Sequence, residues 1–477
     1  MPHAEMLIAG HCIGGPCDQS VPKSVLRNPF NGSVAGTAAE GGPNEAEAAV
    51  AAAHEAFETW RFSPPEERAA LLDRIASTIR ERREELAELL VGEIGKPIVW
   101  ARGEVDRMAV TFTLSAQSAR ELAPTAQDLE YDSRGRAYEG SWQRVPLGPT
   151  LCIVPWNWPF NLAAHKIGPA LAAGNTVVLK PSTLSPISTL TLARLIHECG
   201  CPPGVINAIN IPGRIAQDLA QDPRIKKVSF TGSPEIGWKL KSLLPKKRVT
   251  LELGGDASAI VLPDADLDWA AVRCAHSAFG YAGQVCISLQ HVWAAESIYD
   301  AVRERLIRET DGCPTGDPRK EETICGPLIS SEEADRVEAW ISEAVSQGAK
   351  VLVGGGREGN VLFPTLIENV PQNTSLGCQE VFGPVLTLNR VRSLDEAIER
   401  VNASNYGIHA SVFTSDSARA DEAVRKLEVG GVVVNDFPSL RFDGLPYGGV
   451  RESGFGREGV PFAIEEMSEL KSVVKRR

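Results

Sequence analysis

The sequence has few cysteines, no long apolar run and no excess of positive charge, and each absence excludes a class of protein. Ten cysteines among 477 residues are too sparse for the disulfide frameworks of small secreted domains. No run of about 18 apolar residues marks a membrane span, and the stretch from Met1 to Pro22 lacks the basic-then-apolar order of a secretory signal. We therefore expect a cytoplasmic protein with no membrane partner.

The charge balance disfavours a nucleic-acid partner. Asp and Glu number 61 against 49 Lys and Arg, a formal net charge of -12, whereas proteins that bind nucleic acid present Lys and Arg patches to the phosphates. The basic residues between 471 and 477 are too few to reverse this balance. At about 100–200 residues per domain, the length predicts roughly three domain-sized units.

Two pairs of cysteines are closely spaced, Cys12 with Cys17 and Cys199 with Cys201, and each pair has a histidine nearby. Neither pair has the Cys-x-x-Cys spacing of a zinc site or a matching second pair elsewhere. We therefore expect reduced thiols and no metal site.

The first hundred residues are predicted to be mainly helical. Ser63-Pro64-Pro65-Glu66 offers a capping serine, a proline at the first helical position and a glutamate three residues after the serine, so a helix is expected to begin there. Leucines and isoleucines follow from Leu71 to Leu90 near helical spacing and give this helix one buried face. The alanine-rich stretch 45–60 predicts another helix.

From about residue 148, short β-branched runs alternate with helical stretches, which predicts a parallel, doubly wound sheet with right-handed crossovers. Ligands of such sheets bind beyond the carboxyl ends of the strands. These ends place 155–160, 180–183, Gly213 and 231–233 along one rim. The expected strands are 150–154, 176–179, 205–211, 227–230 and 249–253.

A second α/β unit is expected between about 255 and 440. The alternating polar and aromatic residues of 127–143 predict a hairpin that projects from the first sheet, and the tail 464–474 is a candidate partner strand. Helices of the second unit are expected near 267–278, 300–309 and 331–347.

Two segments are candidates for binding a phosphate. Residues 454–459 spell the Gly-x-Gly-x-x-Gly pattern, but no strand runs directly into them, so we do not expect a phosphate there. The stronger candidate is 230–235, where a strand ends and a helix with an early proline begins, because free backbone N–H groups at such a helix start accept phosphate oxygens.

Three polar side chains stand in unusual surroundings. Cys286 lies in a glycine-flanked polar turn, and a thiol whose pKa falls below about 8.5 is the best side-chain nucleophile near neutral pH. Glu252 stands in an apolar strand that runs into two glycines, and a buried carboxylate requires a partner or a role as a base. Asn157 lies between two tryptophans and two prolines, a rigid position for an oxyanion donor.

In this order and spacing, the three motifs resemble those of the aldehyde dehydrogenase superfamily, and the resemblance covers essentially the whole chain. It implies an α/β fold with a doubly wound, parallel-sheet dinucleotide-binding domain (1–122 and 145–254), a second α/β catalytic domain (255–440) and a small β oligomerisation arm (123–144 and 462–477). It also implies a homodimer or homotetramer. Further matching motifs are 174–182, 380–384 and 446–454.

The resemblance implies NAD(P)-dependent oxidation of a small aldehyde to the carboxylic acid. Cys286 would attack the carbonyl carbon as a thiolate, while the Asn157 amide and the Cys286 N–H hold the oxyanion. Glu252 would activate the water that hydrolyses the resulting thioester. Lys166 and Glu458 match a proton relay of some relatives, or else they are a lysine and a glutamate on the solvated surface.

For the cofactor, the resemblance implies that Glu380 holds the nicotinamide ribose beside Phe382, and that Lys180 binds the adenosine ribose. Many NAD-preferring relatives carry Glu where this chain has Thr183, and a hydroxyl there removes the repulsion of a 2′-phosphate, so NADP or NAD is expected. Asp256 also departs from the family, without an effect that we can derive. The remaining implied cofactor residues are Val154, Pro155, Trp156, Ser182, Gly213, Phe230, Thr231, Gly232, Ser233, Leu253 and Gly254.

The substrate is less clearly indicated. Trp158, Val285 and Ile287 are implied to flank the aldehyde, and a bulky indole favours a short substrate. Arg441 and Arg107 are placed to bind an anionic group, or else they form surface salt bridges. The sequence is most similar to lactaldehyde and phosphonoacetaldehyde dehydrogenases, although Val285 replaces a further arginine of the phosphonate-handling relatives. Lactaldehyde, glycolaldehyde, glyceraldehyde or a similar short aldehyde, with or without an anionic group, is expected.

Three alternatives stay open. In a coenzyme A-acylating dehydrogenase, coenzyme A takes the acyl group, but such relatives usually lack the Glu252 base. A non-catalytic scaffold with this fold needs neither Asn157 nor Cys286. A thiol esterase would use Cys286 without a nicotinamide pocket.

Overall fold

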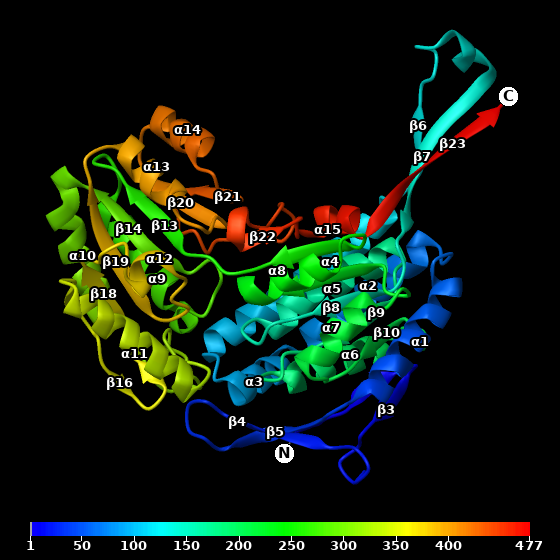
Figure 1. Cartoon of the computed structure of the whole chain (residues 1–477), viewed down its shortest axis with the longest axis horizontal. Coiled ribbons are helices and arrows are strands. Elements are labelled where there is room, and N and C mark those ends of the chain that lie inside the picture. Colours follow the sequence, from blue (N-terminus) through cyan, green and yellow to red (C-terminus); the bar gives the residue numbers. More distant parts are fainter. Residues whose placement is uncertain (1) are drawn as a thin grey trace.

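The computed structural model describes residues 2–477 as two α/β lobes and a projecting arm (Figure 1). The first lobe is built on an eight-stranded sheet and the second on a seven-stranded sheet. β22 (Gly454–Phe455) pairs with the edge of the first sheet, and α15 (Val460–Glu466) packs on the first lobe near the base of the arm (Figure 1). The segment 454–459 therefore forms the short edge strand β22 and the turn that leads into α15.

Five parallel strands form the centre of the first sheet, in the order β12, β11, β8, β9, β10. The chain runs from β8 to β10 on one side and returns to β11 on the other, so the strand order switches between β8 and β11. Each expected strand overlaps an observed one. They are β8 (Thr150–Ile153), β9 (Val177–Lys180), β10 (Ile206–Ala208), β11 (Lys227–Thr231) and β12 (Arg248–Glu252), extended antiparallel beyond β10 by β2 (Met6–Ile8) and β3 (His11–Ile13).

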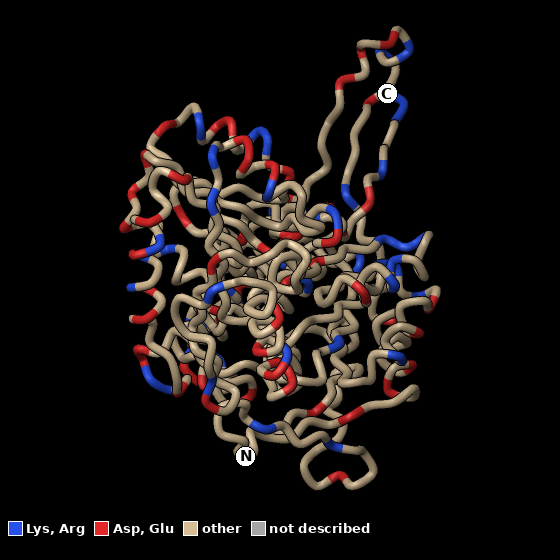
Figure 2. Tube along the Cα trace, turned by 60° about the vertical axis from the view of Figure 1, so that its left-hand side comes forward, with Lys and Arg blue, Asp and Glu red and all other residues tan. Residues whose placement is uncertain are grey.

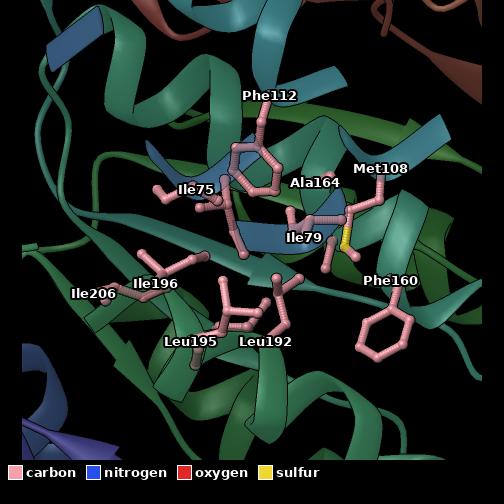
Figure 3. Packing of buried hydrophobic residues seen from close by; sticks show 14 of the residues in the cluster. Ile75, Ile79, Met108, Phe112, Phe160, Ala164, Leu192, Leu195, Ile196 and Ile206 are labelled. Carbon is pink, nitrogen blue, oxygen red and sulfur yellow. The ribbon is translucent and has the colours of Figure 1, made fainter. Parts of the chain in front are cut away.

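Helices cover this sheet and bury two apolar clusters. Ile75, Phe112, Ala164 and Leu192, from four different helices, lie close together in the larger one (Figure 3). Burying one such large side chain contributes about 1.5–3 kcal/mol. The helices are α1 (Pro43–Trp60), α2 (Pro65–Glu81), α3 (Arg83–Ile94), α4 (Ile98–Arg120), α5 (Pro159–Ala173), α6 (Pro186–Glu198), α7 (Gly213–Gln221) and α8 (Pro234–Leu243).

The prediction for the first hundred residues is partly wrong. The helix expected at Ser63 begins at Pro65, and the Ser63 hydroxyl donates to the Trp60 carbonyl (2.7 Å) instead of capping it. The helix also breaks at Arg82, whose φ of -99° and ψ of 20° separate α2 from α3. Both helices bury their apolar faces in one core, so spacing alone did not reveal the break. Strands precede the helices: β1 (His3–Ala4), β2, β3, β4 (Lys23–Arg27) and β5 (Val34–Ala39).

The second sheet has six parallel strands in the order β18, β19, β14, β13, β20, β21, with β15 antiparallel at one edge. The three helices expected here are present as α9, α10 and α11. The strands are β13 (Ala257–Val261), β14 (Leu289–Ala295), β15 (Lys350–Val353), β18 (Thr365–Glu368), β19 (Val385–Val391), β20 (His409–Phe413) and β21 (Gly431–Val434), with a small hairpin of β16 (Arg357–Glu358) and β17 (Val361–Leu362). The helices are α9 (Leu267–Phe279), α10 (Tyr299–Asp311), α11 (Ser331–Ser346), α12 (Ser375–Cys378), α13 (Leu394–Asn402) and α14 (Ser417–Lys426).

The arm is a three-stranded antiparallel sheet that stands away from the first lobe (Figure 1). β7 (Tyr138–Pro146) lies between β6 (Thr125–Gln127) and β23 (Ser468–Arg476), so the C-terminal tail pairs with the hairpin. The tail strand begins at Ser468 and not at 464, because α15 extends to Glu466. Figure 2 shows acidic and basic residues interspersed over both lobes and the arm. No helix among residues 2–477 is both long and apolar enough to cross a membrane.

Candidate active site

Two cavities share Asn157, Leu162 and Cys286 in their walls. The first has a volume of about 240 Å³ and is lined mainly by apolar and aromatic side chains from both lobes. The second has a volume of about 390 Å³ and follows the carboxyl ends of β8, β9, β11 and β12. Cys286 therefore lies where an apolar pocket meets the strand-end cleft of a doubly wound sheet.

The loop that carries Cys286 has a strained backbone. It connects α9 to β14, and Tyr281 and Ala282 have φ of 51° and 54°, followed by Gly283 with φ of 67°. Left-handed conformations of residues other than glycine cost about 1–3 kcal/mol each and persist only where the surroundings enforce them. The buried Gln284 side chain provides such enforcement, because it makes hydrogen bonds to three backbone groups.

Asn157 follows β8 and is joined to the Cys286 loop. Its Nδ2 donates to the carbonyl of Gln284 at 2.9 Å, and the side chain is buried. A side-chain amide has two N–H donors, so the second one is left for a ligand. The structure thus brings the expected nucleophile and the expected oxyanion donor to one wall.

The Cys286 thiol has a polar neighbour to which sequence analysis gave no role. The Tyr447 hydroxyl lies 3.0 Å from Sγ, and the Arg441 guanidinium lies 3.6 Å from the centre of the tyrosine ring. Burial raises the pKa of the thiol to about 12, and the hydrogen bond with Tyr447 acts in the opposite direction. The motif 446–454 contains Tyr447, but a sequence motif does not show which atoms its side chains reach.

Glu252, the last residue of β12, is buried but lines neither cavity. Within residues 2–477 neither of its carboxylate oxygens has a hydrogen-bond partner. Burial, followed by the negative charge of Glu458, raises its pKa well above the usual range. A Cβ added to Gly448 would come within 2.9 Å of Oε1, so the carboxylate is held against the backbone next to Tyr447.

Lys166 and Glu458 form a buried ion pair with an Nζ–Oε1 distance of 2.8 Å and side chains that are 0% and 2% exposed. The alternative of two solvated surface residues is therefore wrong. Burial alone would raise the pKa of Glu458, but the charges of Lys166 and Arg441 outweigh burial and lower it. An ionised Glu458 in turn favours the protonated form of Glu252.

The two candidate substrate arginines both line the first cavity and share one carboxylate. Arg107 makes two hydrogen bonds to Asp443, at 2.6 and 3.2 Å, and Arg441 Nε lies 3.5 Å from the same group. Arg441 is only 5% exposed, so the surface salt bridge suggested for it is wrong, whereas Arg107 is 31% exposed and paired. His165 also contacts Asp443, at 2.9 Å. The two residues are 278 positions apart in the sequence, so no local pattern predicted this contact.

The other expected substrate residues, Trp158, Val285 and Ile287, line the first cavity. Sequence analysis missed several aromatic neighbours in the same wall, because single aromatic residues in helices and loops carry no local signal. These are Trp100, His276 and Phe437.

The second cavity contains all but one of the expected cofactor residues. Gly213 is the exception. It begins α7, the helix that follows β10. The cavity lies at the switch point between β8 and β11, and β9 separates β10 from that point. Gly213 is therefore not part of the wall of this cavity, and its contact with a cofactor stays a prediction. The lining residues are Val154, Pro155, Trp156, Lys180, Ser182, Thr183, Phe230, Thr231, Gly232, Ser233, Leu253, Gly254, Glu380 and Phe382.

The chemistry of the second cavity fits a dinucleotide. Lys180 lines this cavity, and burial lowers its pKa to about 8, so a polar or anionic ligand there would favour its charged form. The α8 N-terminus follows Ser233 and presents free backbone N–H groups and a positive dipole end. Glu380 accepts a hydrogen bond from the Gly255 N–H at 2.9 Å, and burial raises the pKa of this carboxyl to about 8. Close by, a Cβ on Gly254 would lie 2.3 Å from Glu380 Oε2, so only glycine leaves the carboxylate in place.

Comparison with known proteins decides the family. Residues 18–473 match the aldehyde dehydrogenase family. The chain belongs to this family. The 3-sulfolactaldehyde dehydrogenase of Priestia aryabhattai is 39% identical to it over 466 residues, which cover 98% of this chain and 97% of that protein.

Solved aldehyde dehydrogenase structures share the whole fold. Aldehyde dehydrogenase 21 of Physcomitrella patens, in complex with the reaction product succinate, superimposes with a TM-score of 0.96 at 36% identity, over 100% of this chain and 98% of that one. The NADP-dependent glyceraldehyde-3-phosphate dehydrogenase of Bacillus halodurans C-125, complexed with NADP, does so with a TM-score of 0.96 at 33% identity, over 100% of each chain. The predicted aldehyde dehydrogenase fold is confirmed.

Proposed function

We propose that this protein oxidises a short aldehyde to the carboxylic acid, with NADP or NAD as the hydride acceptor. The observation that carries the proposal is the position of Cys286 in the wall shared by the two cavities. A nucleophile at such a junction can hold a substrate from the apolar pocket beside a cofactor in the strand-end cleft.

In the first half of the reaction, the Cys286 thiolate adds to the carbonyl carbon, and the free N–H of Asn157 donates to the oxyanion. One such donor is worth about 2.7–4 kcal/mol of barrier. When bound, the nicotinamide supplies the acceptor for the hydride that the thiohemiacetal carbon gives up. The oxygen then regains its carbonyl bond, which leaves a thioester on Cys286.

In the second half, water adds to the thioester, the C–S bond breaks, and the acid and the thiol are released. We assign Glu252 as the base because it is a buried carboxylate without a partner and with a raised pKa, properties of a general base. It lines neither cavity, so a change of rotamer away from Gly448 has to precede this step. The buried Lys166–Glu458 pair lies next to it and is our candidate for passing the proton on.

For the cofactor, we propose that Lys180 binds the adenosine ribose and that Glu380 holds the nicotinamide ribose beside Phe382. Thr183 lines the same cavity and leaves room for a 2′-phosphate without like-charge repulsion. The NADP complex of the Bacillus halodurans enzyme supports NADP as a cofactor of this fold.

For the substrate, we propose a short aldehyde such as lactaldehyde, glycolaldehyde or glyceraldehyde, or an anionic analogue. Two of the relatives above are named for 3-sulfolactaldehyde and glyceraldehyde 3-phosphate, and the third is bound to its reaction product succinate; all three compounds are short and anionic. The small cavity under Trp158 fits the length. Three cations, Arg107, Arg441 and Lys166, share the two carboxylates of Asp443 and Glu458, so positive charge remains for an anionic group.

We further propose that the arm joins subunits into a homodimer or homotetramer. Tyr131, Leu470 and Val474 are exposed on it at 83%, 54% and 63%, and the sheet has open edges that a second copy can extend. On this assignment 1–122 and 145–254 form the dinucleotide-binding domain, 255–440 the catalytic domain, and 123–144 with 462–477 the oligomerisation arm.

The test is to incubate the pure protein with NADP or NAD and a panel of short aldehydes, with and without coenzyme A, and to follow the absorbance of the reduced nicotinamide. Absorbance that rises without coenzyme A supports the proposal. A rise only with coenzyme A would identify an acylating enzyme, which the presence of Glu252 argues against. Cofactor binding without any turnover would identify a scaffold, and ester hydrolysis without nicotinamide a thiol esterase.

A further inference from the structure

We infer that Tyr447 is a further catalytic residue, whose hydroxyl donates a hydrogen bond to the Cys286 thiolate both when the sulfur attacks and when it leaves. The inference rests on the proposed function, in which Cys286 is the nucleophile. Its basis is the 3.0 Å contact between the hydroxyl oxygen and Sγ. Among residues 2–477, neither group makes another side-chain hydrogen bond, so each is available to the other alone.

The direction of this hydrogen bond follows from the chemistry of the two groups. A thiolate has no proton to donate, so once Cys286 is ionised the hydroxyl has to be the donor. The phenol keeps the proton that it needs, because burial and the charge of Cys286 raise the pKa of Tyr447 well above 10. A donor that favours the ionised sulfur counteracts the burial that otherwise holds the thiol protonated.

Tyr447 is held firmly in this position. Its backbone pairs with Glu458 through two hydrogen bonds, of 2.9 and 2.7 Å, and its ring meets the edge of His409 at a centroid distance of 5.3 Å. The Arg441 guanidinium, 3.6 Å from the ring centre, withdraws electron density, which makes the hydroxyl a better donor. The side chain is 3% exposed, so water does not compete for the hydroxyl.

The charged groups around Cys286 do not by themselves stabilise its thiolate. Glu252 and Glu380 both disfavour the thiolate, and Arg441 is the cation that favours it. A neutral phenol stabilises the sulfur without placing a further ion in an apolar cavity, where an unpaired ion is costly. When the thioester C–S bond breaks, the same hydroxyl meets the negative charge that returns to the sulfur.

The test uses Tyr447→Phe, which removes only the oxygen. Iodoacetamide alkylates the thiolate of Cys286, forms an S–C bond and releases iodide, while the thiol proton passes to the buffer. The rate is followed from about pH 7 to 10 in cofactor-free protein, by mass spectrometry of the Cys286 peptide. Tyr299→Phe is the matched control, because this buried tyrosine donates to Glu368 at 3.0 Å in the second lobe and lines neither cavity.

Loss of a hydrogen bond to a charged sulfur is expected to raise the thiol pKa by about one to two pH units. A more basic thiolate is also more nucleophilic, with a Brønsted slope of about 0.4–0.5, so the alkylation rate should fall about 3–16-fold at each pH. Replacing Tyr447 with 3,5-difluorotyrosine, a stronger donor of the same shape, should change the pKa in the opposite direction. Tyr299→Phe should leave the rate as in the wild type.

Unchanged alkylation in Tyr447→Phe, in a protein whose thermal unfolding matches the wild type, would overturn the inference. So would an equal loss in Tyr299→Phe, which would indicate a general loosening of the fold. The readout needs neither aldehyde nor nicotinamide. If the wild type oxidises no aldehyde but the alkylation still slows in Tyr447→Phe, the proposed function fails while the hydrogen bond to Cys286 stands.

Discussion

Replacing Gly254 with alanine is predicted to weaken cofactor binding without unfolding the protein. An added Cβ would lie 2.3 Å from Oε2 of Glu380, whereas non-bonded heavy atoms pack at about 3.5 Å or more. The carboxylate therefore has to move by about 1 Å. It is the far end of a flexible side chain, so it can do so at little cost to the fold, but the movement breaks its 2.9 Å hydrogen bond with the Gly255 N–H.

The size of the effect follows from what Glu380 is proposed to do. A hydrogen bond from a ribose hydroxyl to a carboxylate contributes about 1.5–3 kcal/mol. Losing it should raise the dissociation constant of NADP and of NAD about 10–100-fold. Tryptophan fluorescence provides the assay, because Trp156 lines the same cavity, and the thermal unfolding midpoint shows whether the fold is intact.

Gly213→Ala is the matched control. Nothing lies within 4 Å of a Cβ at that position, and Gly213 begins α7 outside the cavity. Its dissociation constants should equal those of the wild type. If Gly254→Ala bound both cofactors within about twofold of the wild type, Glu380 would not be a cofactor ligand, and the reasoning from the close approach of Gly254 would be refuted.

Three further predictions concern charge. Thr183→Glu should weaken NADP binding about tenfold or more while leaving NAD binding unchanged, because its negative charge repels the 2′-phosphate. Thr183→Gln, of equal size but neutral, should leave NADP binding unchanged. Equilibrium titration with each cofactor distinguishes the two variants. Hydrolysis of the acylated enzyme should speed up as the pH rises through the raised pKa of Glu252, since a base acts only once ionised. A hydrolysis rate that does not change over that pH range in single-turnover experiments would exclude Glu252 as the base. Lys166→Met should lower the free energy of unfolding, by at most about 3–5 kcal/mol, because the buried Glu458 loses its partner at 2.8 Å and keeps only Arg441 at 3.4 Å. A thermal unfolding midpoint equal to that of the wild type would show that the pair is not needed.

Local sequence patterns predicted part of the wall of the second cavity, for a physical reason, whereas most residues of the first cavity were implied only by the family resemblance or were not predicted. The carboxyl ends of parallel strands meet at one edge of a sheet, so the residues after β8, β9 and β11 converge without any knowledge of long-range packing. Asn157 and Lys180 both come from such ends. Gly213 lies outside the cavity wall because β9 separates β10 from the switch point, and strand order cannot be inferred from any single strand.

Long-range contacts and rotamers were beyond the sequence. The contacts of Asp443 with His165 and Arg107 join residues that are hundreds of positions apart, so no spacing reveals them. The orientation of Glu252 away from both cavities is a rotamer choice set by its neighbours. The contact of Tyr447 with Cys286 likewise appears only when both lobes are folded.

The central claim is that Cys286 carries the acyl group, and Glu252→Gln tests it most directly because this variant should form the thioester but fail to hydrolyse it. The variant is mixed with NADP and a short aldehyde, quenched in acid, digested and examined by mass spectrometry. We expect a burst of about one NADPH per active site and an acyl group on the Cys286 peptide. A burst with that peptide unmodified, or with the acyl group on another cysteine, would contradict the account.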